Sequence, residues 1–136
     1  MTYAVSAALQ KGVFALLSSD VDLTALVGSA IYDAAPAGAA PALFVSLGAE
    51  RVDARSSTCC AGALHRFTVS IIAQDQGGFV RAKEAAAAVC DALDGSTPSL
   101  ERGRVVYMTF ERADARRATG ARRRIDLRFV ARVEDN

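Results

Sequence analysis

Residues 122–134, RRRIDLRFVARVE, alternate polar and apolar side chains more regularly than any other stretch of the chain. A period of two is typical of a β-strand that buries one face and exposes the other. We therefore predict a strand here, with its apolar face turned inward. The inward side chains are expected to be Ile125, Leu127, Phe129, Ala131 and Val133, and the outward ones Arg124, Asp126, Arg128 and Arg132.

Weaker alternation predicts three more strands, at residues 42–48, 64–73 and 104–114. In the last of these, Val106, Met108 and Phe110 should share one face. The segment Ala115–Ala121, which contains Gly120, is typical of a hairpin connection between the final two strands. The strands therefore form two consecutive pairs along the chain.

Apolar side chains that recur every three or four residues predict helices at residues 3–17 and 79–93. Asp20, or the serine before it, can cap a short helix that Gly28 ends. The order α-α-β-β-α-β-β predicts an α+β fold, with a mostly antiparallel four-stranded sheet and helices packed on one face. A chain of 136 residues suits a single domain, residues 1–136.

Composition excludes several classes of function. The formal net charge is +1, so the whole molecule has no strong attraction to nucleic acid or to acidic membranes. No stretch approaches the ~20 apolar residues of a membrane helix, and residues 1–13 lack the pattern of a signal peptide. The three cysteines, Cys59, Cys60 and Cys90, fit no disulfide framework and are typical of a reducing cytoplasm.

Candidate catalytic and metal-binding residues are few. His65 is the only histidine, and Cys59 and Cys60 are adjacent, which is poor spacing for zinc. A Cys59–His65 nucleophile pair is a weaker interpretation than cysteines without a chemical role and a histidine at the start of a strand. Gly77 and Gly78 precede a predicted helix but lack the lysine and further glycines of phosphate-binding loops. We therefore predict no catalytic residue, no metal and no cofactor, and a protein that is not an enzyme.

The largest local charge imbalance surrounds the predicted hairpin. Its arginines are Arg112, Arg116, Arg117, Arg122, Arg123 and Arg124. In one interpretation they pair with Glu111, Asp114 and Asp126 across the strands and solvate the turn. In the other they form a docking surface for an acidic partner or for a nucleic-acid backbone. Few aromatic residues lie among them, so sequence-specific recognition of bases is not expected.

Several short segments occur in an order and spacing that carry a family resemblance. They are Leu16–Asp20, Leu26–Gly28, Ile31–Asp33, Pro36, Pro41, Leu43–Gly48, His65–Val69, Ala82–Lys83, Ala92–Leu93, Val105–Val106 and Arg124–Phe129. In this arrangement, which covers nearly the whole chain, the sequence resembles phage tail-completion proteins, and especially the tail terminators of gene transfer agents. The adjacent Cys59 and Cys60 depart from the family pattern.

The resemblance implies a structural protein without catalytic residues. Such proteins form a homo-hexameric ring that caps the tail tube at its head-proximal end, joins it to the neck and leaves a channel for DNA. The implied partners are further copies of the chain, the tail tube protein and a neck or stopper protein, with DNA passing through without sequence-specific binding. The implied location is the tail or neck of a virion-like particle assembled in the bacterial cytoplasm, with no membrane partner.

Three alternatives stay open at this point. In the first, the chain is a neck stopper or a minor tail protein of the same kind of particle. In the second it is a small nucleic-acid-binding module that uses the arginine-rich hairpin. A small enzyme that uses Cys59 or Cys60 is the third and weakest.

The polar segment at residues 50–62 is a candidate inter-subunit arm. It lacks a helical stripe and is longer than a tight hairpin requires. We predict that it is mobile in the free subunit and becomes ordered when it reaches a neighbour in the ring. The residues expected to make that contact are Arg51, Asp53, Arg55, Ser56 and Thr58.

Overall fold

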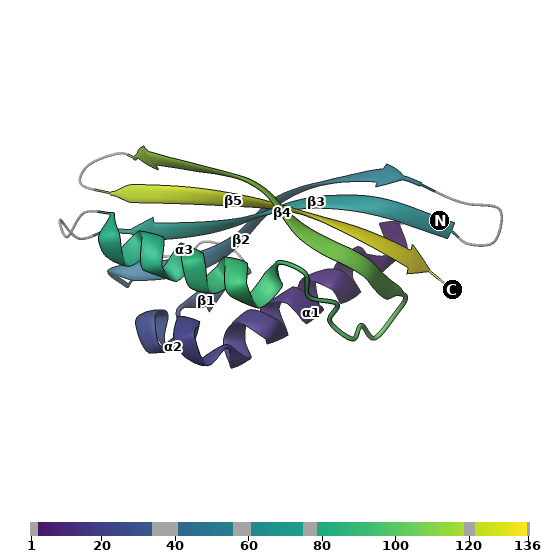
Figure 1. The fold of residues 1–136 in the computed structure, drawn as a ribbon, viewed down its shortest axis with the longest axis horizontal. Coiled ribbons are helices and arrows are strands. Elements are labelled where there is room, and N and C mark those ends of the chain that lie inside the picture. The colour runs from purple at the N-terminus through teal and green to yellow at the C-terminus, as the bar shows by residue number, and fades with distance from the viewer. Residues whose placement is uncertain (1–2, 34–40, 56–60, 75–78, 119–121, 136) are drawn as a thin grey trace.

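The chain folds as one sheet with its helices packed against one face (Figure 1). The computed structural model describes residues 3–33, 41–55, 61–74, 79–118 and 122–135. Its elements are a 3-10 turn (Tyr3–Val5), α1 (Ser6–Ser19), α2 (Val21–Val27), β1 (Ile31–Tyr32), β2 (Leu43–Ala54), β3 (Ala61–Ala73), α3 (Val80–Leu93), β4 (Arg104–Arg117) and β5 (Arg123–Asp135). The α+β class and the three predicted helices are confirmed. No helix in the described part of the chain is long and apolar enough to cross a membrane.

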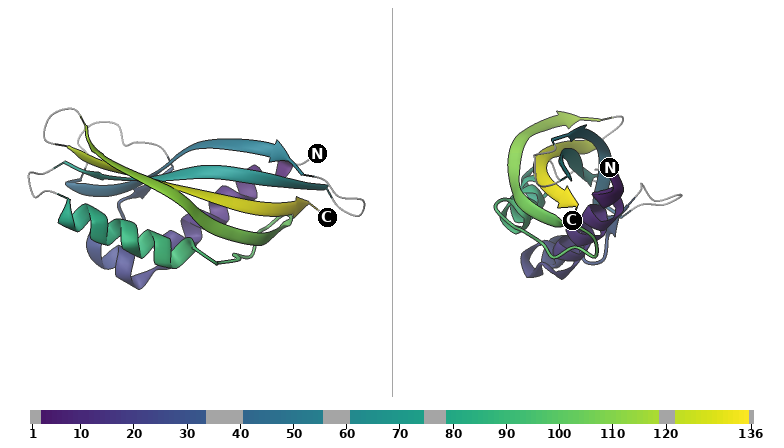
Figure 2. Two further views of the ribbon diagram at one scale, coloured as in Figure 1. Left: turned by 45° about the horizontal axis from the view of Figure 1, so that its top comes forward. Right: turned by 90° about the vertical axis from the view of Figure 1, so that its right-hand side faces the viewer.

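The strands form one five-stranded sheet in the order β1-β2-β3-β5-β4. β1 pairs parallel with β2, and the other neighbours are antiparallel. The mostly antiparallel sheet is thus confirmed, whereas β1 is an additional strand that the sequence did not predict. With two residues it is too short to show a period. The long strands twist and curl as they cross the molecule, as the end-on view shows (Figure 2).

The apolar face of β5 forms the centre of the core, as its alternation predicts. Phe129 is fully buried, and its ring stacks on that of Phe67 with the ring centroids 5.7 Å apart. Burial of one such side chain contributes about 1.5–3 kcal/mol to folding. The predicted inward residues are all buried: Ile125, Leu127, Phe129, Ala131 and Val133.

Because of a β-bulge near the start of β4, some of its side chains point to the face opposite to the predicted one. The pairing with β5 shifts register between Val105 and Tyr107, so Val106 is an extra residue in the strand. Val105 is consequently buried, and Val106 is 39% exposed. The prediction that Val106 shares a buried face with Met108 is wrong, because one inserted residue moves the neighbouring side chains to opposite faces.

The polar segment at residues 50–62 is largely strand rather than connection. β2 continues through Ala54 and β3 begins at Ala61, so the sequence predicted both strands too short. Residues 56–60 lie outside the described part of the chain. The prediction that residues 50–54 belong to a connection is therefore wrong, because their backbone belongs to the ladder between β2 and β3. The mobility of the segment in the free subunit stays a prediction.

Candidate functional site

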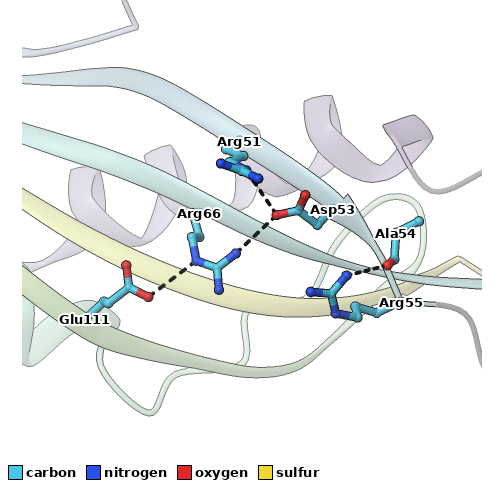
Figure 3. A network of polar contacts seen from close by, with 6 residues as sticks. All are labelled: Arg51, Asp53, Ala54, Arg55, Arg66 and Glu111. Atoms are coloured by element: carbon cyan, nitrogen blue, oxygen red, sulfur yellow. Dashed lines mark hydrogen bonds and ion pairs between the residues drawn. The ribbon is translucent and has the colours of Figure 1, made fainter.

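The face of the sheet opposite the helices, here called the open face, carries a chain of ion pairs (Figure 3). Arg66 of β3 lies at its centre, with its guanidinium 3.2 Å from Asp53 of β2 and 3.4 Å from Glu111 of β4. Asp53 also contacts Arg51 at 3.3 Å. Pairs at such partly exposed positions contribute only about 0–1 kcal/mol each. Their clearer effect is to hold Arg66 in one orientation.

The same residues line a shallow dish of about 450 Å³ on the open face. Its walls are Arg51, Asp53, Arg55, Arg66, Glu111 and Arg128. Both carboxylates are already paired. Arg55 donates a hydrogen bond to the carbonyl of Ala54 at 2.8 Å, and Arg128 forms no ion pair within the described part of the chain. The dish therefore has more positive than negative charge and suits an anionic group.

Asp126 holds a second set of arginines on the open face. Its carboxylate accepts hydrogen bonds from Ser70 Oγ at 2.6 Å and Arg124 Nε at 2.9 Å, and lies 3.6 Å from Arg116. Partial burial alone would raise the pKa of Asp126. The hydrogen bonds from Ser70 and Arg124 and the two positive charges outweigh burial and hold that pKa below its ordinary value. Asp126 is therefore ionised at neutral pH, and its single negative charge compensates one of the two positive charges beside it.

The arginines predicted to form one docking surface lie on two faces of the sheet. In the ladder, Arg116 lies opposite Arg124, and Arg117 lies opposite Arg123. Consecutive side chains of a strand point to opposite faces. Arg123 accordingly lies on the side of α3, with its guanidinium carbon 5.5 Å from the centre of the Phe79 ring.

Ion pairing divides the same arginines further. Arg112 contacts Asp114, two positions along β4, at 3.3 Å. Arg117 and Arg122 are exposed and form no ion pair with the described residues. The expected pairing across the hairpin strands is thus confirmed at Asp126. Arg117 and Arg122 add two further positive charges that no carboxylate of the described residues compensates.

The predicted arm contributes to the dish. Arg51 and Asp53 lie on β2, and Arg55 follows the end of that strand. All three line the dish. Ser56 and Thr58 lie outside the described part of the chain.

Sequence reasoning missed three residues of the dish, Arg66, Glu111 and Arg128. The alternation around Arg66 and Arg128 does predict that both point outward. It does not predict which residues they meet, because that depends on the order of the strands in the sheet.

The candidate catalytic residues form no site in the described part of the chain. His65 is fully buried in β3. Cys90 is a half-buried free thiol, and burial, followed by the charges of two nearby aspartates, raises its pKa and disfavours the reactive thiolate. Among the described residues, no group of histidine, cysteine, aspartate and glutamate could hold a metal ion. Four residues considered for such roles lie outside that part: Cys59, Cys60, Gly77 and Gly78.

Comparisons with known proteins agree with the resemblance found in the sequence. Residues 11–134 match the family described as Tail completion protein gp17. A chain in the solved structure "Virion of native gene transfer agent (GTA) particle" is 51% identical to this chain and superposes with a TM-score of 0.91, covering 98% of this chain and 99% of that one. None of the curated proteins matches. Because the family match spans most of its length, the chain belongs to the tail completion protein gp17 family, which is structural and non-enzymatic.

Proposed function

We propose that this chain is the tail terminator of a gene transfer agent or a similar phage-like particle. It forms a homo-hexameric ring that caps the tail tube at its head-proximal end, joins it to the neck and leaves a channel for DNA. The observation that carries the proposal is the 51% identity, over 98% of the chain, to a chain of a gene transfer agent virion. Its partners are further copies of itself, the tail tube protein and a neck or stopper protein.

The charges of the open face support assembly with proteins rather than recognition of nucleic acid. The arginines there alternate with Asp53, Glu111 and Asp126, each of which is ion-paired. A phosphate backbone approaching this face would meet fixed negative charges as well as positive ones, which weakens the electrostatic attraction that dominates DNA binding.

Electron cryomicroscopy of particles tests the proposal. We expect density for a ring of this chain between the tail tube and the neck, and tubes of irregular length in particles that lack it, because nothing then stops tube growth. A ring on the portal side of the neck with tails of normal length would instead identify a stopper. A position at the distal end of the tail, or a single copy, would refute the terminator.

The arginine-rich hairpin is proposed to contact an acidic surface on a neighbouring subunit or ring. Single substitutions should be mild, because peripheral pairs contribute about 0–1 kcal/mol each. The decisive variant changes four arginines to glutamate: Arg116, Arg117, Arg122 and Arg123. It should fold as a monomer yet fail to assemble. Normal yields of DNA-filled particles would show that the hairpin arginines only solvate the turn.

A control separates folding from docking in this variant. Arg116 contacts Asp126, so its reversal also disturbs the sheet. The double variant Arg117→Glu with Arg122→Glu leaves that contact intact and should still impair assembly. Strongly salt-dependent binding of the wild-type protein to duplex DNA would instead favour the nucleic-acid-binding module.

A further inference from the structure

Carboxylates without a partner are confined to one side of the molecule. The carboxylates on β2–β5 all take part in hydrogen bonds or ion pairs: Glu50, Asp53, Glu111, Asp114, Asp126, Glu134 and Asp135. Those that form neither within the described part of the chain are Asp22, Asp33, Glu84 and Asp91. None of these lies on β2–β5, so the uncompensated negative charge lies on the helical side and around β1.

Most arginines without a carboxylate partner show the opposite distribution. Five lie on β4 and β5 or directly beside the strands: Arg55, Arg117, Arg122, Arg128 and Arg132. The exception among the described residues is Arg81 of α3, which donates a hydrogen bond to the Leu26 carbonyl at 3.4 Å. Two of the five, Arg55 and Arg128, face the same dish. Among the described residues, the dish thus carries excess positive charge, whereas the carboxylates without a partner lie on the helical side, where the exposed cations Arg81 and Lys83 flank them on α3.

The negative charge on α3 forms a stripe. Glu84, Ala87 and Asp91 are all exposed and follow one another at helical spacing. Seven residues of helix separate the two carboxylates by roughly 10 Å along the axis. The buried side of α3, which includes Val89 and Leu93, packs on the core, so this stripe faces away from its own sheet.

The open face also has features of a protein interface. Tyr107 is 44% exposed and lies opposite Arg132 in the ladder, so the two side chains are neighbours on one face. Exposed tyrosine beside arginine is the composition enriched at protein–protein interfaces.

We propose that two copies of this chain dock head to tail, with the exposed stripe of α3 from one copy against the dish on the open face of the next. Glu84 and Asp91 of the first copy then neutralise Arg55 and Arg128 of the second. The two surfaces differ, so the contact is heterologous, and a repeated heterologous contact closes into a ring when its rotation allows. This inference rests on the proposed ring, but it is tested with purified protein.

Two charge-reversed variants test the docking. The first changes Glu84→Lys and Asp91→Lys, and the second changes Arg55→Glu and Arg128→Glu. In sedimentation velocity at low salt, the wild-type protein should self-associate. Each variant alone should associate roughly ten-fold or more weakly, because like charges then face each other. An equimolar mixture should regain association. The lysines on α3 of the first variant then face the glutamates in the dish of the second, and the unchanged α3 of the second faces the unchanged dish of the first.

Controls and outcomes make the test decisive. Circular dichroism must show that both variants fold, and a variant with Arg55→Lys and Arg128→Lys should associate like the wild type. A wild-type protein that stays monomeric, variants that associate normally, or a mixture that does not recover would each overturn the docking. Loss of duplex DNA binding without a change in self-association would overturn it too and assign the dish to DNA. None of these results depends on where microscopy places the ring, so failure of the docking and failure of the proposed function are distinguishable.

Discussion

Replacing Asp126 with asparagine isolates the charge that organises the arginines of the open face. The amide has the same size and still accepts from Ser70 Oγ, but it loses the attraction to Arg124 and Arg116. Hydrogen bonds to a charged group contribute about 1.5–3 kcal/mol, and partial exposure reduces that amount. We therefore expect Asp126→Asn to lower the free energy of unfolding by about 1–2 kcal/mol at pH 7, and the melting temperature by about 3–8 °C.

The direction of the Asp126 pKa shift determines how the stability difference between the two proteins changes with pH. The pKa of Asp126 in the folded chain lies below its ordinary value of 3.8, so the ionised carboxylate stabilises the fold. That stabilisation is fully present above about pH 4–5 and is lost as the pH falls through the lower, folded pKa. The difference between the wild-type protein and the variant should therefore shrink towards zero in strong acid.

Urea unfolding of both proteins at pH 7 and at about pH 2.5 measures the effect. Asp114→Asn is the matched control, because Asp114 is exposed and its one ion pair among the described residues is with Arg112 of its own strand, at 3.3 Å. We expect that control to cost less than about 0.5 kcal/mol at either pH. If Asp126→Asn costs no more than Asp114→Asn, or if its cost persists unchanged in acid, the reasoning about this carboxylate is refuted.

Four further predictions concern the fold. Phe129→Ala empties the centre of the core and should cost about 3–5 kcal/mol in urea unfolding; a cost below about 1 kcal/mol would contradict its central place. Gly103→Ala should cost about 2–4 kcal/mol, because its φ is +70° and an added Cβ would lie 2.6 Å from the Glu134 carbonyl oxygen. Gly28→Ala, at φ +61° with open space around it, should cost only about 1–2 kcal/mol. Backbone amides that the β2–β3 ladder protects within residues 50–54 should exchange slowly in the isolated subunit, and fast deuterium exchange there would restore the mobile arm.

Much of the fold was predictable because its strongest signals are local. The period of β5 places Phe129 and its alternating neighbours in the core, and the structure buries them. α3 likewise buries Val89 and Leu93 at the spacing its sequence predicts. The two-residue strand β1 and the bulge at Val106 were not predictable, because neither leaves a period in the sequence.

The sequence by itself determined the three helices and the centres of the four long strands, and that Arg66 and Arg128 point away from the core. Periodicity is a property of neighbouring residues, so it is present in the chain before any tertiary contact forms. Only the tertiary structure decided that Arg66 meets Asp53, 13 residues away, and Glu111, 45 residues away. The order β2-β3-β5-β4 brings those carboxylates to one face, and strand order is set by long-range pairing that no local pattern encodes.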